Sequence, residues 1–157
     1  MLKTMVLTPE KCLGCRTCEL ACAFNRAGEF NPQRAAVSVI PYEKAMICVP
    51  IMCNQCEDAS CARICPVKAI DRDENGAMII SEKKCIGCKM CISACPLGNM
   101  ALDSEGVFKC NLCGGDPLCA KLCPSGAIEF KEANPSALLK RKAIAEKFSD
   151  AFGEEAK

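Results

Sequence analysis

The sequence of 157 residues contains no histidine and no tryptophan, and tyrosine occurs once, as Tyr42. The absence of histidine excludes His-ligated zinc, a Rieske centre, haem held by a proximal His and a Ser-His-Asp triad. It also removes the commonest general acid-base residue. Aromatic residues make up only 4% of the chain, which is too few for a core built on large rings. Some other feature must therefore hold the fold together.

An excess of one charge and long apolar runs are missing as well. The 20 basic and 19 acidic residues leave a formal charge of +1, so no basic footprint indicates nucleic acid as a partner. The longest uncharged apolar stretch, at residues 45–55, is far shorter than the roughly 20 residues that a membrane helix needs. The apolar segment within residues 1–8 is too short for a secretory signal. We therefore expect a soluble, cytoplasmic protein without direct membrane insertion, in which thiols stay reduced.

Cysteine, by contrast, is abundant, with 17 residues in the chain. Sixteen of them form four groups of four, in which a C-x2-C pair is followed by two further cysteines that are themselves four residues apart. The groups are Cys12, Cys15, Cys18 and Cys22; Cys53, Cys56, Cys61 and Cys65; Cys85, Cys88, Cys91 and Cys95; and Cys110, Cys113, Cys119 and Cys123. Proline follows the last cysteine in groups two, three and four. Only Cys48 is left over, and it is most simply a small buried hydrophobic residue.

This spacing has a chemical reason. Three thiolates on a tight loop can each reach one iron of a cube, while the fourth, on a segment that departs from the loop, is aimed away from it. In two-cluster ferredoxins the fourth cysteine ligates the other cluster, so each pair of groups predicts two [4Fe–4S] sites with exchanged ligands. Four zinc sites with four thiolates each are the alternative, although zinc usually takes two C-x2-C knuckles separated by a longer loop. A disulfide scaffold conflicts with the reducing compartment.

The gaps between the groups indicate which groups pair. The 19 residues between Cys65 and Cys85 contain two short strand-like segments around Asn75-Gly76, which is typical of a hairpin. Groups two and three therefore resemble a complete two-cluster unit, and groups one and four are left to pair around it. Strand-like segments at residues 4–7 and 127–130 could then pair as well.

The nested arrangement assigns four sites. The first site is Cys12, Cys15, Cys18 and Cys123; the second is Cys110, Cys113, Cys119 and Cys22; the third is Cys53, Cys56, Cys61 and Cys95; and the fourth is Cys85, Cys88, Cys91 and Cys65. Consecutive pairing, of group one with two and of three with four, is the rival. It would have to span 30 residues between Cys22 and Cys53 but only 14 between Cys95 and Cys110.

The predicted fold class is α+β, with two nested ferredoxin-like units, short hairpins, few regular elements and a C-terminal helix. The outer unit comprises residues 1–30 and 100–130, and the inner unit comprises residues 45–99. Further hairpins are expected from strands at 36–42 and 45–50, and from the segment 100–108. A tail at 131–157 has a good N-cap in Asn134 and predicts a helix that either docks on the clusters or grips a partner or a second copy of the chain.

Residues between the cysteines are candidates for tuning the sites. Lys11, Lys84 and Lys109 each precede the first cysteine of a group, and Lys89 and Lys121 lie inside groups. They could offset cluster charge and tune reduction potentials, although an ordinary solvated lysine is the simpler interpretation of each. Gly14 and Gly87 occupy the same position in groups one and three, where positive φ would turn amides towards sulfur. Each oxidised site adds two negative charges, so four sites take the formal charge from +1 to about −7.

A buried series of redox centres without acid-base apparatus predicts electron relay rather than bond chemistry. Two functions stay open: a subunit that connects a catalytic oxidoreductase subunit to an acceptor or donor protein, and a free polyferredoxin that shuttles electrons between enzymes.

The segments CLGCRTCELAC, CNQCEDASCARICPVKAI, KCIGCKMCISACPLGN and KCNLCGGDPLCAKLCPSGAI resemble the four-cluster iron–sulfur subunits of the dimethyl sulfoxide reductase and formate dehydrogenase type, over roughly residues 4–130. The resemblance implies the nested pairing and four [4Fe–4S] clusters, since Cys91 is present. The chain lacks the long insertion in group four and the membrane-docking extension of many relatives. Its compact group four is more similar to small polyferredoxin subunits that serve carbon monoxide dehydrogenases, hydrogenases and tungsten aldehyde oxidoreductases, and the last type is favoured.

Overall fold

The computed structural model of the protein describes residues 3–132, and residues 5–130 of these form one compact unit. Four two-stranded sheets, four α-helices and four 3-10 helices make up the regular structure of the described residues, so the predicted α+β class is confirmed. The helix expected in the tail falls on residues 133–157, outside the described residues. Lys131 and Glu132, which the tail was predicted to include, are instead the last residues of a strand.

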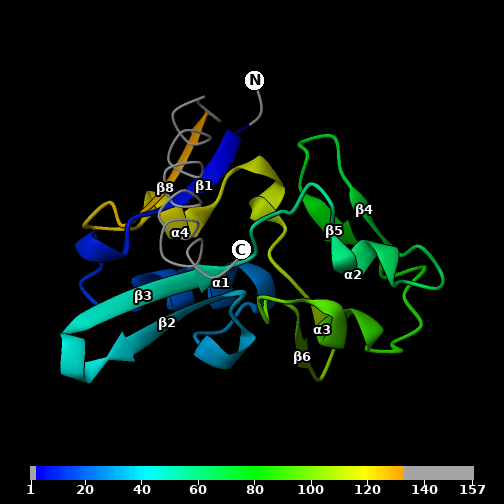
Figure 1. The fold of residues 1–157 in the computed structure, drawn as a ribbon, viewed down its shortest axis with the longest axis horizontal. Helices are drawn as coiled ribbons and strands as arrows, with labels where there is room; N and C mark the ends of the chain where they lie inside the picture. Colours follow the sequence, from blue (N-terminus) through cyan, green and yellow to red (C-terminus); the bar gives the residue numbers. More distant parts are fainter. Residues whose placement is uncertain (1–2, 133–157) are drawn as a thin grey trace, which may run out of the picture. The chain divides into compact units, whose positions relative to one another are not determined.

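The first and last strands lie next to each other although the whole described chain separates them. β1 (Lys3–Leu7) pairs with β8 (Ile128–Glu132), as Figure 1 shows in blue and orange. The Thr8 N–H continues the pairing by donating to the Ala127 carbonyl at 2.9 Å. The pairing predicted between residues 4–7 and 127–130 is thereby confirmed.

The other three sheets are hairpins, each of which lies between two successive cysteine groups. β2 (Val37–Tyr42) pairs with β3 (Ile47–Met52). β3 begins and ends two residues later than the strand predicted at residues 45–50. β4 (Ile70–Arg72) pairs with β5 (Met78–Ile80), and the Gly76 N–H closes the intervening turn onto Asp73. β6 (Ala101–Asp103) pairs with β7 (Gly106–Phe108).

Each α-helix carries the third cysteine of one group. The helices are α1 (Thr17–Ala27), α2 (Ser60–Arg63), α3 (Met90–Ala94) and α4 (Leu118–Lys121). α1 packs against α4, and α2 packs against α3, so groups one and four are neighbours and so are groups two and three. Within residues 3–132 no helix has the length and hydropathy needed to cross a bilayer.

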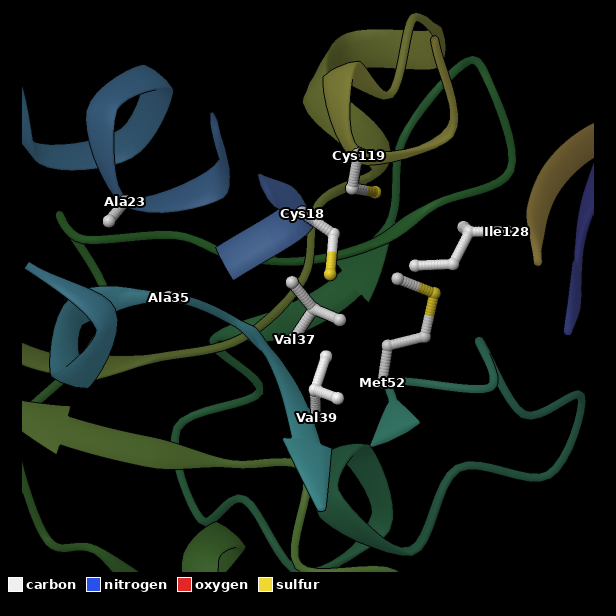
Figure 2. Close-up of a cluster of buried hydrophobic side chains, with 8 residues drawn as sticks. All are labelled: Cys18, Ala23, Ala35, Val37, Val39, Met52, Cys119 and Ile128. Atoms are coloured by element: carbon white, nitrogen blue, oxygen red, sulfur yellow. The ribbon is translucent and has the colours of Figure 1, made fainter. Parts of the chain in front are cut away.

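Two small apolar clusters form the core, and sulfur and alanine fill much of both. The first contains Cys18, Ala23, Ala35, Val37, Val39, Met52, Cys119 and Ile128, which Figure 2 shows as sticks. The second contains Ala59, Ile70, Met78, Cys91 and Met100. β3 lies in the range predicted for the inner unit, but its Met52 packs in the first cluster with residues of groups one and four. Buried cysteine therefore takes the place of the missing aromatic residues in both clusters.

Candidate iron–sulfur sites

The loop between the first two cysteines of each group has the same backbone conformation. The residue two positions after the first cysteine has a left-handed φ in all four groups: Gly14 (67°), Gln55 (51°), Gly87 (68°) and Leu112 (54°). Glycine adopts this conformation freely, and the positive φ predicted for Gly14 and Gly87 is confirmed. Gln55 and Leu112 adopt it at a cost of about 1–3 kcal/mol each, so tertiary contacts must compensate. Leu112 is buried, and the side chain of Gln55 is held by hydrogen bonds.

The third and fourth cysteines of each group flank or occupy a helix, which the sequence argument did not foresee. In groups two, three and four the helix is a single turn, the third cysteine lies in it, and the fourth follows within two residues of its end. In group one both Cys18 and Cys22 lie inside α1, which continues to Ala27. The expectation that every fourth cysteine begins a departing segment is therefore wrong for Cys22.

Two cavities are lined by cysteines from groups that are distant in sequence. Cys12, Cys15 and Cys18 of group one line one cavity together with Cys123 of group four. Cys85, Cys88 and Cys91 of group three line another together with Cys65 of group two. In both cavities the remaining lining is largely apolar, with Val39 and Ile128 beside the first set and Ile70 and Val107 beside the second.

The remaining cysteines, apart from Cys56, influence one another electrostatically in two further sets. Burial raises the pKa of Cys22, and the thiol of Cys113 in group four adds to the shift. Burial also raises the pKa of Cys119, with further contributions from Cys110, Cys22 and Cys113.

The other set joins groups two and three. Burial raises the pKa of Cys61, and the thiols of Cys53 and Cys95 raise it further. Cys56, assigned to the same site by sequence, is exposed. Among the described residues no three cysteine or acidic side chains converge closely enough to share one ion. A cube spreads its ligands, because each thiolate binds a different iron.

The sulfur of the fourth cysteine accepts a backbone hydrogen bond in groups one, two and three, and it lies within hydrogen-bond distance of a serine hydroxyl in group four. The Ala69 N–H donates to Cys65 Sγ (3.2 Å), and the Asn99 N–H donates to Cys95 Sγ (3.3 Å), in each case from four residues further along. Cys123 Sγ lies 3.7 Å from Ser125 Oγ. Cys22 Sγ instead accepts from the N–H of Ala36, fourteen residues away, at 3.3 Å. Hydrogen bonds of this kind stabilise thiolates and influence cluster potentials.

Comparison with known proteins decides which family this arrangement represents. A 4Fe-4S dicluster domain matches residues 44–133, and a 4Fe-4S binding domain matches residues 9–25. The aliphatic sulfonate oxidoreductase polyferredoxin-like subunit of Pyrococcus furiosus is 38% identical over 122 residues, which cover 76% of this chain and 70% of that protein. The chain belongs to the 4Fe-4S dicluster domain family.

A second relative and a solved structure are similar to this chain over most of its length. The putative electron transport protein YsaA of Escherichia coli is 36% identical over 141 residues, which cover 82% of this chain and 89% of that one. In the solved active site complex BamBC of benzoyl coenzyme A reductase, one chain superposes with a TM-score of 0.50 and 26% identity over 96% of this chain and 91% of that chain. This dicluster-family protein is an iron–sulfur electron-transfer subunit that binds several [4Fe–4S] clusters.

The thiols of this chain fit such a cofactor electrostatically. Burial raises the pKa of Cys18 to about 11 and that of Cys110 to about 11, so both thiols retain their protons at neutral pH in the absence of metal. At the exposed edge of the first set, a side-chain hydrogen bond from Thr17 lowers the pKa of Cys15. Several thiolates held together in a partly buried space need positive charge, and the iron atoms of a cluster supply it. Metal binding therefore displaces protons and stabilises the fold at the same time.

Successive sets of cysteines are linked to one another by packing or by electrostatic interaction. Cys18 of the first set and Cys119 of the second lie in the same apolar cluster, and Figure 2 shows them next to each other. Burial raises the pKa of Cys110, and among the further contributions is the thiol of Cys53, which belongs to the third set. Cys61 of the third set packs against the cluster that contains Cys91 of the fourth. For the predicted sets, these links give the order first, second, third and fourth.

The residues around the sites are partly those expected. Lys11, Lys84, Lys89 and Lys121 are exposed, as ordinary solvated lysines would be, whereas Lys109 is buried. Cys48 is partly buried and packs on the first apolar cluster. An ideal Cβ at Gly14 would lie 2.7 Å from Cys48 Sγ, so glycine is required there for space as well as for φ.

Sequence reasoning missed several polar residues that support the sites. Glu19 in α1 is buried and accepts from the N–H of Val39 at 2.6 Å, which ties α1 to β2. Asp103 accepts from Arg26 and from Arg34 (3.2 Å), which ties the β6–β7 hairpin to α1. Charged residues next to a cysteine motif give no local signal of such distant partners.

Proposed function

We propose that the sixteen grouped cysteines bind four [4Fe–4S] clusters. The ligand sets are Cys12, Cys15, Cys18 and Cys123; Cys22, Cys110, Cys113 and Cys119; Cys53, Cys56, Cys61 and Cys95; and Cys65, Cys85, Cys88 and Cys91. The observation that carries the proposal is that two cavities are each lined by three cysteines of one group and the fourth cysteine of a distant group. This is the ligand exchange found in two-cluster ferredoxins.

Two nested units follow from this exchange. We assign residues 1–30 and 100–130 to an outer unit, which binds the first two clusters, and residues 45–99 to an inner unit, which binds the other two. The packing of α1 on α4 and of α2 on α3 supports the division. The β2–β3 hairpin connects the units and packs on the outer one through Val37 and Met52.

The function is a relay of single electrons through the four sites in their spatial order. Each cluster, when bound, takes up and releases one electron. The protein holds the ligands of neighbouring sites against each other, as Cys18 and Cys119 are held, so that each transfer is short. Apolar residues such as Val39 and Ile128 line the first site and limit the access of water. Cys15 of the first site, Cys56 of the third and Cys88 of the fourth are exposed, so electrons can enter or leave at both ends and at the third site.

We further propose that the chain is non-catalytic itself, resides in the cytoplasm and connects a catalytic oxidoreductase subunit to a donor or acceptor protein. The Pyrococcus furiosus relative, named as a subunit of an aliphatic sulfonate oxidoreductase, supports the role of a dedicated subunit. The compact form of group four favours a tungsten aldehyde oxidoreductase as the catalytic partner.

Quantification of iron tests the cofactor proposal. Protein purified without oxygen should contain about sixteen iron atoms per chain, and its reduced form should give the electron paramagnetic resonance signals of interacting [4Fe–4S] clusters. A value near eight, or a colourless zinc protein, would refute four clusters.

Purification from the native cell tests the role. A dedicated subunit should elute with a large partner in a fixed ratio, and the partner should carry the tungsten. Elution as a small acidic monomer would instead establish a free shuttle.

A further inference from the structure

Lys109 differs from the lysines that occupy the same position in other groups. Lys11, Lys84 and Lys109 each directly precede the first cysteine of a C-x2-C pair. The first two are exposed, as is usual for lysine, whereas Lys109 retains only 6% of its exposure. A buried ammonium is costly unless it is fully hydrogen-bonded, so the protein must hold this one in place for a reason.

Three oxygen acceptors surround the Lys109 ammonium. It donates to the carbonyl of Met78, to the carbonyl of Cys110 (2.8 Å) and to Gln55 Oε1 (3.4 Å). An ammonium has three N–H donors and no acceptor, so this environment matches the charged form. Gln55 is itself fixed, because its Oε1 accepts from the Met78 N–H (2.8 Å) and its Nε2 donates to the Cys110 carbonyl (3.0 Å).

These contacts place the positive charge between the second and third sites. Cys110 belongs to the second site, and Gln55 lies on the loop between Cys53 and Cys56 of the third. Burial raises the pKa values of Cys61 and Cys110, and the charge of Lys109 opposes the shift at both thiols. Among the described lysines, Lys109 alone is buried, and its charge acts on ligands of both middle sites.

We propose that Lys109 is a built-in charge that raises the reduction potentials of the two middle clusters above those they would otherwise have. This inference rests on the four-cluster function proposed above. Each reduction adds one negative charge to a site, and a fixed positive charge nearby in a poorly screened interior stabilises the reduced form. The charge therefore makes electron uptake by the two middle clusters, at the boundary between the two units, more favourable than it would be without Lys109.

Redox titration of the intact holoprotein, followed by electron paramagnetic resonance, tests the proposal. Lys109→Gln and Lys109→Met remove the charge, and Lys109→Arg keeps it. The neutral variants should lower the reduction equilibrium constants of two of the four clusters by about tenfold or more, which is 59 mV for one electron. Lys109→Arg should stay close to the wild type. The matched controls Lys11→Met and Lys84→Met remove exposed charges before equivalent cysteines and should change every potential by less than half as much.

Iron content separates this proposal from the function on which it rests. A wild-type chain with fewer than about sixteen irons refutes the four-cluster function, whatever the variants do. A fully loaded Lys109→Gln chain with unchanged potentials, or with all four lowered equally, overturns the role of Lys109 alone. If neither neutral variant binds the full complement of iron, the variant Gln55→Glu provides the test of Lys109 instead, because it places a carboxylate beside the retained ammonium. It should lower the same two potentials, and unchanged potentials would overturn the proposal.

Discussion

Group one differs from the three other cysteine groups in the path of the chain around the fourth cysteine. In groups two, three and four the helix ends one or two residues before the fourth cysteine, a proline follows that cysteine, and the chain turns back. The N–H three residues after the cysteine then donates to its carbonyl, as Gly98 does to Cys95 at 3.2 Å. In group one Ala23 takes the place of proline, and α1 continues to Ala27, where Gly28 ends it with a φ of 70°.

The difference shows where a thiolate can obtain its hydrogen bond. A proline-ended helix supplies the donor locally, four residues after the cysteine, as Asn99 does for Cys95. A helix that continues cannot do this, because its amides are committed to its own carbonyls. Cys22 therefore depends on Ala36, which the chain brings back only after a long excursion. In exchange, the continuation of α1 beyond Cys22 presents Arg26 to the β6–β7 hairpin.

The largest expected effect comes from removing the fourth cysteine of group one. Cys22→Ala should reduce iron content by up to four atoms per chain, because the second site loses a ligand. The double variant Cys22→Ala with Cys113→Ala should lose no more iron than the more affected single variant, since both changes damage one cluster. Cys22→Ala with Cys15→Ala should lose about twice as much. The reverse pattern would show that group one keeps its own fourth ligand.

Making group one resemble the others should be the next most damaging change. Ala23→Pro places a proline in the interior of α1 at a residue with no exposure, which costs about 3 kcal/mol or more. The midpoint of thermal bleaching of the cluster absorbance should fall by roughly 6–12 °C. Ala23→Gly is the control, because it weakens the helix by only about 1 kcal/mol without removing an amide. Equal effects of the two substitutions would contradict the requirement for a continuous α1.

The ion pairs at the end of α1 should matter less. Asp103→Asn removes the carboxylate that Arg26 and Arg34 share, and should cost about 2 kcal/mol at pH 7. Asp116→Asn, which breaks the exposed pair with Lys121, should cost at most about 0.5 kcal/mol in the same thermal assay.

The contribution of Asp103 should also depend on pH. Burial raises the pKa of Asp103, but the hydrogen bond from Arg26 outweighs it and lowers the pKa to about 2. Since an aspartate in the unfolded chain has a pKa of about 3.9, the stabilisation is complete above pH 4 and is lost as the pH falls towards 2. The deficit of Asp103→Asn should therefore shrink below pH 4. A deficit that stays constant there would show that the ion pair is not its origin.

The smallest expected effect comes from removing a proline that ends a helix. Pro96→Ala should cost about 0.4–1 kcal/mol, mainly by increasing the freedom of the unfolded chain. The turn itself should persist, because Asn99 still donates to Cys95 Sγ and Gly98 still supplies a φ of 63°. Thermal bleaching should move by no more than roughly 4 °C. A loss as large as that of Ala23→Pro would mean that the proline, rather than the hydrogen bonds, holds the turn.

Local rules were enough to predict much of this fold. The β4–β5 hairpin follows from Asn75-Gly76 between two short apolar segments, and the left-handed backbone at Gly14 and Gly87 follows from glycine itself. α1 could also have been found, because Gly28 is a typical stop signal after a helical stretch. The ligand sets remain predictions that the iron measurements above will test.

Features that depend on distant partners could not be predicted in this way. Lys109 and Lys84 occupy the same position in their motifs, and only the acceptors on Met78 and Gln55 make one buried and the other exposed. Gln55 likewise has no local reason for a positive φ, which its hydrogen bonds across the molecule offset. The identity of a residue next to a cysteine does not reveal which part of the chain will cover it.

The pairing of β1 with β8 has a consequence for folding during synthesis on the ribosome. β1 is synthesised first but cannot find its neighbour until the last described strand has been made. At usual translation rates the hundred residues between Cys22 and Cys123 take roughly 5–20 s to appear. Until group four has been synthesised, the cysteines of group one lack the cysteines with which they are proposed to share clusters. The β4–β5 hairpin, by contrast, is complete before group four emerges. The proposed ligand sets therefore predict that maturation begins in the middle of the described chain and finishes with groups one and four.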